Sequence, residues 1–129
     1  MATPSHPADL SSLDKLSQTL LERARELPEG SYTTKLMLGG VPKIAGKVRE
    51  EAEEMIEAAE ALSPDKAVSE IDPSDKDRQH LIYEAGDLIY HTLVMLAHRG
   101  VGIQEVVAEL ARREGTSGLV EKANRPPKT

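Results

Sequence analysis

Apolar residues recur every three or four positions along most of this 129-residue chain. That spacing lines one face of an α-helix, and it predicts helical segments at about residues 10–27, 31–38, 43–62, 79–99 and 104–113. The aromatic residues are only three tyrosines, so the core must be built from Leu, Ile, Val, Met and Ala, which suit helices better than a β-sandwich. The pattern therefore predicts an all-α bundle of four to five helices.

Proline and glycine mark the boundaries between these segments. Gly39-Gly40-Val41-Pro42 separates residues 31–38 from 43–62, and a hydrophilic connector with one expected helical turn near 67–71 precedes the next helix. Residues 1–9 carry two prolines and little apolar content, so we expect a disordered lead-in. One domain then spans 10–125, and 126–129 form a short tail.

The segment 79–99 is apolar on more than one face. Its main stripe consists of Leu81, Ile82, Ala85, Leu88, Ile89, Thr92 and Leu96, and outside that stripe lie Leu93, Val94, Met95 and Ala97. Such a surface predicts that the bundle is completed by homodimerisation or a larger assembly, unless this helix is central within one chain. In the segment 104–113, the residues expected to point inward are Val106, Val107 and Leu110.

Two acidic pairs lie at the borders of apolar stripes. In the segment 43–62 the stripe runs from Ile44 through Val48 to Leu62, and Glu51 and Glu54 lie at about −60° and −120° from Val48. Three other glutamates, Glu50, Glu53 and Glu57, point away from the stripe. Two of the five acids are therefore directed toward whatever this helix packs against.

The second pair has the same spacing and a similar placement. Glu84 lies at about −100° and Asp87 near −160° from Ala85, and His91 lies near −120°. If the two helices pack antiparallel, the four carboxylates converge and repel unless cations bind there, which predicts Mg²⁺ or Mn²⁺ chemistry. The ordinary alternative is that these acids are solvated or form ion pairs along their own helices.

The composition argues against several other classes of function. The net charge of −6 and the pI of about 5.2 argue against broad binding to nucleic acid and against docking on anionic lipid. The chain has no cysteine, which excludes disulfides, thiolate ligands and a cysteine nucleophile. No segment reaches the roughly 20 apolar residues of a membrane span, and the chain does not begin like a signal peptide, so we expect a cytoplasmic protein.

Four stretches carry a more specific pattern than the acidic pairs alone. They are Ser31-Tyr32-Thr33-Thr34-Lys35-Leu36, Lys43-Ile44 with Lys47-Val48-Arg49-Glu50-Glu51-Ala52, Glu84-Ala85-Gly86-Asp87-Leu88-Ile89-Tyr90-His91, and Glu109-Leu110-Ala111-Arg112-Arg113 running to Ser117-Gly118 and Glu121-Lys122. In this order they resemble the phosphoribosyl-ATP pyrophosphatases of histidine biosynthesis, within the wider MazG-like all-α nucleotide pyrophosphatases. The resemblance covers about residues 10–125.

The resemblance implies Mg²⁺-dependent hydrolysis of phosphoribosyl-ATP to phosphoribosyl-AMP and pyrophosphate. By position, the resemblance implies that the metal ligands are Glu51, Glu54, Glu84 and Asp87. One of the outer carboxylates would orient the attacking water. Glu50 matches the first glutamate of the family's pair, but it points away from the core and ranks below these four.

Basic side chains are the candidates for holding substrate phosphates that the metal does not reach. Lys35, Lys43 and Lys47 lie near the expected entrance, and Arg112, Arg113 and Lys122 come from the C-terminal part, conceivably across a dimer interface. An ordinary surface cation is the simpler interpretation for each except Lys47, which lies one turn from Glu51 on the same edge.

The remaining polar residues have weaker assignments. His91 is more simply a hydrogen-bonded structural histidine than a ligand, and Tyr32 and Tyr90 are expected to stack or hydrogen-bond in the core. Arg49 and Glu53 depart from the family pattern, which leaves open a house-cleaning nucleoside triphosphate pyrophosphatase with the same metals. A catalytically silent helical dimerisation protein is the alternative from a different class.

Overall fold

The computed structural model describes residues 8–62, 72–115 and 118–126, and within them it is all-helical, as the sequence predicts. The described helices are α1 (Ser11–Glu26), α2 (Tyr32–Ala61), α3 (Lys76–His98), α4 (Ile103–Arg113) and α5 (Gly118–Ala123). The turn expected near 67–71 and most of the expected disordered lead-in and tail lie outside the described residues. None of the described helices combines the length and apolar character needed to cross a membrane.

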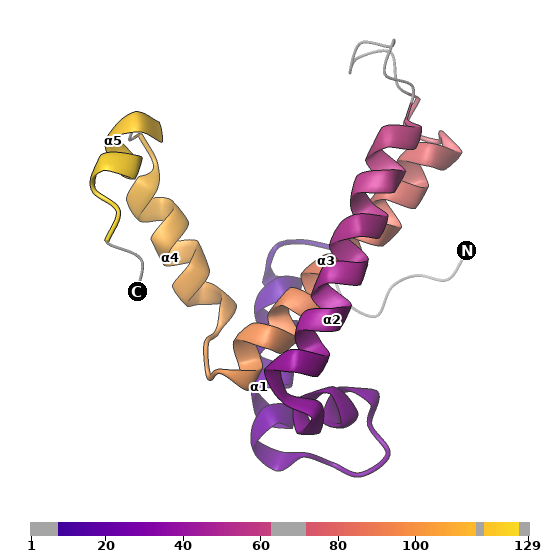
Figure 1. Cartoon of the computed structure of the whole chain (residues 1–129), viewed down its shortest axis with the longest axis vertical. Helices are drawn as coiled ribbons and strands as arrows, with labels where there is room; N and C mark the ends of the chain where they lie inside the picture. The colour runs from indigo at the N-terminus through magenta and orange to yellow at the C-terminus, as the bar shows by residue number, and fades with distance from the viewer. Residues whose placement is uncertain (1–7, 63–71, 116–117, 127–129) are drawn as a thin grey trace.

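Helices α2 and α3 form the main packing unit of the molecule. They run antiparallel beside each other, and α1 packs across their lower part (Figure 1). Asp75 caps the beginning of α3, because its carboxylate accepts hydrogen bonds from the backbone N–H groups of Asp77 and Arg78 at 2.9 and 3.2 Å. The antiparallel arrangement of α2 and α3 is the one that the two acidic edges need in order to converge.

The hydrophobic core lies where the first three helices meet. It contains Leu20 from α1, Leu36, Met37 and Ile44 from α2, and Leu93, Val94 and Ala97 from α3. We expected Leu93, Val94 and Ala97 to need a second chain to cover them, and that expectation is wrong. These side chains are buried within one chain because α1 and the first part of α2 pack against the C-terminal half of α3.

The predicted apolar stripes of the acidic segments are only partly buried. Ile56 on α2 and Ile82 and Ile89 on α3 remain 46%, 50% and 46% exposed. The physical reason is a rotation of both helices: they turn their acidic borders toward each other, and the buried positions include Glu51, Ala58, Glu84 and His91. Part of each stripe therefore faces outward from the pair, whereas Ile44 and Val48 of α2 pack in or against the core.

The predicted break between residues 31–38 and 43–62 is a kink inside one long helix. Gly40 has φ 72° and ψ −171°, a conformation that is essentially restricted to glycine, and Pro42 follows at the start of the next helical turn. The segment before the kink lies against α3, where the Tyr32 hydroxyl and His91 Nε2 are 3.1 Å apart and Thr33 Oγ1 lies 2.7 Å from the Tyr90 hydroxyl.

Helix α4 starts against α1 and then leaves the bundle. The backbone N–H of Ile103 donates to Ser17 Oγ at 2.9 Å, which fixes the start of α4 on α1. Beyond that point α4 and α5 project away from α2 and α3 (Figure 1). Val107 and Leu110 are more than half exposed, so the prediction that they point inward is wrong, because beyond its start α4 projects away from the helices that could bury them.

Candidate metal centre

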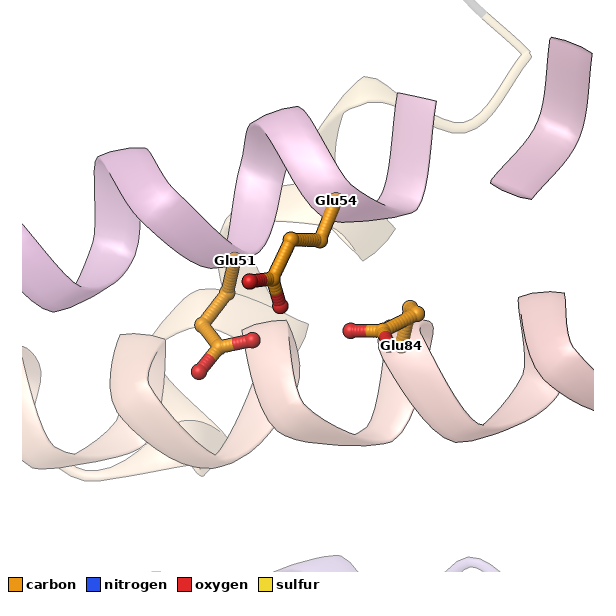
Figure 2. A group of neighbouring side chains, drawn as sticks. All are labelled: Glu51, Glu54 and Glu84. Carbon is orange, nitrogen blue, oxygen red and sulfur yellow. The ribbon is translucent and has the colours of Figure 1, made fainter. Parts of the chain in front are cut away.

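Three carboxylates meet between α2 and α3. Glu51 and Glu54 extend from α2 toward α3, and Glu84 extends from α3 toward them (Figure 2). One oxygen from each of the three lies within 4.8 Å of the others. The structure thus brings together three of the four acids that we predicted as metal ligands, with Glu84 30 and 33 positions after Glu54 and Glu51 in the sequence.

Burial distinguishes Glu51 and Glu84 from ordinary surface acids. Their residues are only 7% and 8% exposed, and one oxygen of each, Oε2, is buried without a hydrogen-bond partner. A buried carboxylate oxygen without a partner destabilises the fold by the free energy of its lost hydration. A divalent cation would satisfy both oxygens, and carboxylates are the ligands that Mg²⁺ prefers in proteins, so the residues fit such an ion.

The proton affinities of these acids are changed by the same environment. Burial raises the pKa of Glu51 to about 7, with further contributions from a hydrogen bond to Glu54 and from the negative charges of Asp87, Glu54 and Glu50. The pKa of Glu84 is also raised, first by burial, then by a hydrogen bond to Glu54 and its charge. Without a cation Glu51 and Glu84 therefore bind protons more readily than ordinary glutamates, and a bound cation would favour their ionised form.

Asp87 and Glu50 stand apart from this three-carboxylate group. Asp87 is partly buried and close enough for its charge to raise the pKa of both Glu51 and Glu84, but it is not among the three acids whose oxygens gather. Glu50 is exposed and lies 3.6 Å from the ammonium group of Lys47. That ion pair agrees with the lower rank that the helix geometry assigned to Glu50.

Among the predicted phosphate-binding cations, Lys47 lies nearest to the site. Its pKa is raised, mainly by Glu50, with smaller contributions from Tyr32 and Glu51, so the ammonium group stays charged beside the carboxylates. Lys35 and Lys43 are exposed on α2, one on each side of the kink. These lysines provide positive charge on the helix that carries Glu51 and Glu54.

Arg112, Arg113 and Lys122 are not brought to the acidic group of their own chain. They lie on α4 and α5, which project away from the α2–α3 pair (Figure 1). The Glu109 carboxylate accepts hydrogen bonds from Arg112 Nη2 at 2.7 Å and from Arg113 Nε at 3.1 Å, and these bonds lower the pKa of Glu109 to about 2. Glu109 thus holds both guanidinium groups at the end of α4.

The hydrogen bond between Tyr32 and His91 was not predicted from the sequence. The two residues are 59 positions apart, and their hydrogen bond becomes visible only when α2 and α3 are paired. His91 is buried, as expected of a structural histidine, and its Nδ1 lies 3.7 Å from Glu51 Oε1. Tyr32 belongs to the first of the four family-like stretches, which was the available signal.

Comparison with known proteins assigns the family. The family model described as phosphoribosyl-ATP pyrophosphohydrolase matches residues 13–114, which is most of the chain. The chain belongs to this family. Helices α1 to α4 fall wholly or largely within the matched range, including both acidic segments and the α4 arginines.

Individual members of the phosphoribosyl-ATP pyrophosphohydrolase family are similar over nearly the whole chain. A phosphoribosyl-ATP pyrophosphatase from Rhodopirellula baltica is 60% identical over 95% of this chain and 92% of its own length. Proteins of the same name from Rhizorhabdus wittichii and Novosphingobium aromaticivorans are 44% and 45% identical, covering 89% and 88% of this chain and 95% and 92% of their own lengths. The predicted membership of this family is therefore confirmed.

Proposed function

We propose that this protein hydrolyses phosphoribosyl-ATP to phosphoribosyl-AMP and pyrophosphate, the second step of histidine biosynthesis, with Mg²⁺ as its cofactor and Mn²⁺ as a substitute. The supporting observation is the three-carboxylate group of Glu51, Glu54 and Glu84, formed in a member of the phosphoribosyl-ATP pyrophosphohydrolase family. A cytoplasmic location belongs to the same proposal, because a phosphorylated biosynthetic intermediate is kept inside the cell.

The reaction transfers the nucleotidyl group of the substrate to water. A water oxygen attacks the α-phosphorus, the bond from that phosphorus to the oxygen bridging to the β-phosphorus breaks, and pyrophosphate leaves with the bridging oxygen. When bound, divalent cations would neutralise the phosphate oxygens, which carry most of the charge that develops in such reactions. The protein's own contribution is to bind the substrate, orient it and accept the proton of the attacking water.

The acidic residues divide these roles. Glu51, Glu54 and Glu84 would hold the cation, with Asp87 as the fourth ligand. A carboxylate at the outer side of this group, Glu54 or Asp87, would orient the attacking water and accept its proton, because both are more accessible than Glu51 and Glu84.

The lysines of α2 would bind the phosphates. Lys47 is held beside the acidic group by Glu50, and Lys35 and Lys43 have exposed ammonium groups that can reach a triphosphate lying along the helix. Arg112, Arg113 and Lys122 can act only if another copy of the chain supplies them, since their own α4 projects away from the site.

A homodimer is the second part of this proposal. Ile56, Ile82 and Ile89 are about half exposed on the acidic half of the α2–α3 pair, and Val107 and Leu110 are exposed on α4. Apolar side chains on two separate faces are better covered by a second copy of the chain than left in water. A partner's α4, with its two arginines, carries the charge that complements the acidic α2.

Pyrophosphate release is the experiment that tests the activity. Phosphoribosyl-ATP and a panel of ordinary and modified nucleoside triphosphates are each incubated with Mg²⁺ and the wild-type protein, Glu54→Gln or Glu57→Gln. Glu57 lies on the same helix but is exposed and outside the acidic group, so it is the matched control.

We expect release from phosphoribosyl-ATP that Glu54→Gln lowers at least about 100-fold and Glu57→Gln leaves unchanged. Release from panel nucleotides alone would keep the mechanism and assign the protein to the house-cleaning pyrophosphatases. No release from any substrate would overturn the proposal in favour of a silent helical scaffold.

A further inference from the structure

A histidine that contacts two tyrosine rings lies next to Glu51 of the acidic group. His91 is 6% exposed and lies behind Glu51, with Nδ1 3.7 Å from Glu51 Oε1. The ring of Tyr90 meets His91 edge-on at a centroid distance of 5.3 Å, and the ring of Tyr32 does so at 6.2 Å. The His91 ring is therefore enclosed by two aromatic rings and by the carboxylate of Glu51.

Hydrogen bonds fix which nitrogen of His91 carries the hydrogen. Nδ1 lies 3.0 Å from the backbone carbonyl oxygen of Asp87, which can only accept, so Nδ1 must be the donor. In the neutral ring Nε2 then has a free lone pair, and it accepts from the Tyr32 hydroxyl at 3.1 Å. Tyr32 is the residue that stabilises this tautomer, because it donates to the other nitrogen.

We propose that Tyr32 and His91 are positioning residues of the acidic site. The Tyr32 hydroxyl holds the His91 ring so that its Nδ1–H edge faces both the Asp87 carbonyl and Glu51 Oε1. This arrangement fixes the turn of α3 that carries Asp87 and limits the movement of Glu51 away from Glu54 and Glu84. The inference rests on the proposed function, since it assigns the two residues to the same site.

The hydroxyl of Tyr32 also connects the site to the kink in α2. Tyr32 lies before Gly40 and Glu51 lies after it, so the hydrogen bond to His91 ties the two arms of the helix through α3. Half of the Tyr32 surface is exposed. The hydroxyl is thus at the solvent edge of the site, where a substitution changes one polar atom and little packing.

Tyr90 provides a matched control. Its hydroxyl lies 2.7 Å from Thr33 Oγ1 and therefore joins the same two helices, one residue away from each end of the Tyr32–His91 bond. Tyr90→Phe removes a comparable hydrogen bond between α2 and α3 without touching either nitrogen of His91. A purely structural role of Tyr32 would give the two Tyr→Phe substitutions the same consequences.

The first measurement is the tautomer of His91 in the full-length, metal-free protein. Long-range ¹H–¹⁵N correlation spectra at neutral pH distinguish a protonated Nδ1 from a protonated Nε2, and His91→Gln identifies the signal among the four histidines. We expect hydrogen on Nδ1 in the wild type and in Tyr90→Phe, and a changed Nε2 shift in Tyr32→Phe. Hydrogen on Nε2 of the wild-type His91 would overturn the inference without requiring any variant to fold.

The second measurement concerns the acidic site itself. Mg²⁺ affinity by calorimetry and steady-state kinetics on phosphoribosyl-ATP are compared for the wild type, Tyr32→Phe and Tyr90→Phe. We expect Tyr32→Phe to weaken Mg²⁺ binding and lower kcat by about 10-fold each, with KM within about twofold, and Tyr90→Phe to change none of them.

Each other outcome of these measurements is informative. Unchanged values in Tyr32→Phe, or equal losses in both variants, would reject a positioning role. A wild-type protein that binds Mg²⁺ but hydrolyses no phosphoribosyl-ATP would contradict the proposed function alone, because the tautomer and the Mg²⁺ affinities would still decide the inference.

Discussion

At the scale of single residues, Glu51 is the acid whose ionised form is most destabilised in the metal-free site. It is buried, one of its oxygens lacks a hydrogen-bond partner, and three neighbouring acids add to its burial to raise its pKa to about 7. Such a group stabilises a metal-free protein only when protonated. Residues that serve binding at a cost to the empty fold are typical of functional sites.

The stability of the metal-free protein should therefore depend on pH. The folded-state pKa of Glu51 lies above its ordinary value of 4.5, so its favourable contribution is complete below about pH 4.5 and is lost as pH rises through about 7. We expect the free energy of unfolding to fall by roughly 1–3 kcal/mol over this range. Urea denaturation with EDTA between pH 4.5 and 8 measures it.

Two substitutions identify the source of that loss. Glu51→Gln removes the ionisable group and should reduce the decrease, leaving the smaller part that comes from Glu84, whose pKa is also raised. Glu57→Gln, on the exposed side of α2, should retain the wild-type decrease. The same pH dependence in wild type and Glu51→Gln would show that Glu51 is not buried as an acid.

At the scale of elements, the kink in α2 lets one helix serve two purposes. Before Gly40 the helix adds Leu36 and Met37 to the core and Tyr32 to the site; after it, the helix carries Glu51 and Glu54 along α3. A straight helix could not direct both parts onto α3. The kink depends on a backbone conformation, φ 72° and ψ −171°, that residues with a Cβ atom rarely adopt.

Gly40→Ala should consequently destabilise the protein by about 1–3 kcal/mol. An added Cβ would come no nearer than 3.7 Å to Pro42, so the cost arises from the backbone and not from a steric clash. Gly46→Ala, in the regular part of the same helix with no atom within 4 Å, should stabilise by about 0.5–1 kcal/mol. Urea midpoints of the two variants measure the contrast, and equal changes would exclude strain at Gly40.

At the scale of the whole molecule, two helices placed side by side bring the three carboxylates together and leave apolar side chains exposed on the same pair. The acidic borders of α2 and α3 face each other, and Ile56, Ile82 and Ile89 are left half exposed. The proposed metal binding and the proposed self-association therefore depend on the same pair of helices, and each can be measured separately.

Metal binding should raise the melting temperature. At 100 times the dissociation constant a ligand that binds only the folded state adds about 2.7 kcal/mol, which corresponds to roughly 8–12 °C for a chain of this size. Differential scanning fluorimetry with Mg²⁺ and with EDTA measures the shift. Glu54→Gln should lose most of it, whereas an unchanged melting temperature in the wild type would favour the silent scaffold.

Self-association should depend on the exposed isoleucines. We expect a homodimer by sedimentation equilibrium, and Ile82→Glu should weaken dimerisation at least about 10-fold because a charge would be buried at the interface. Gln18→Glu, which introduces the same side chain on the exposed face of α1, should leave it unchanged. A wild-type monomer at micromolar concentration would refute the proposed dimer.

The sequence by itself determined the helical class, the approximate position of each main helix and the break at Gly39–Pro42. Local signals suffice for these features: a period near 3.6 residues, and glycine and proline at the boundaries. The sequence also selected Glu51, Glu54 and Glu84, because their spacing places them beside an apolar stripe. The four family-like stretches correctly indicated the family that the comparisons assign.

Only the tertiary structure decided which way each helix faces. Helical periodicity identifies an apolar stripe but not the neighbour that covers it, so Leu93 and Val94 proved buried within one chain while Ile82 and Ile89 stayed exposed. Likewise, the Tyr32–His91 bond and the pairing of Arg112 and Arg113 with Glu109 depend on side-chain positions that no spacing rule specifies. Contacts between segments arise from packing, which is a property of the assembled helices and not of any one segment.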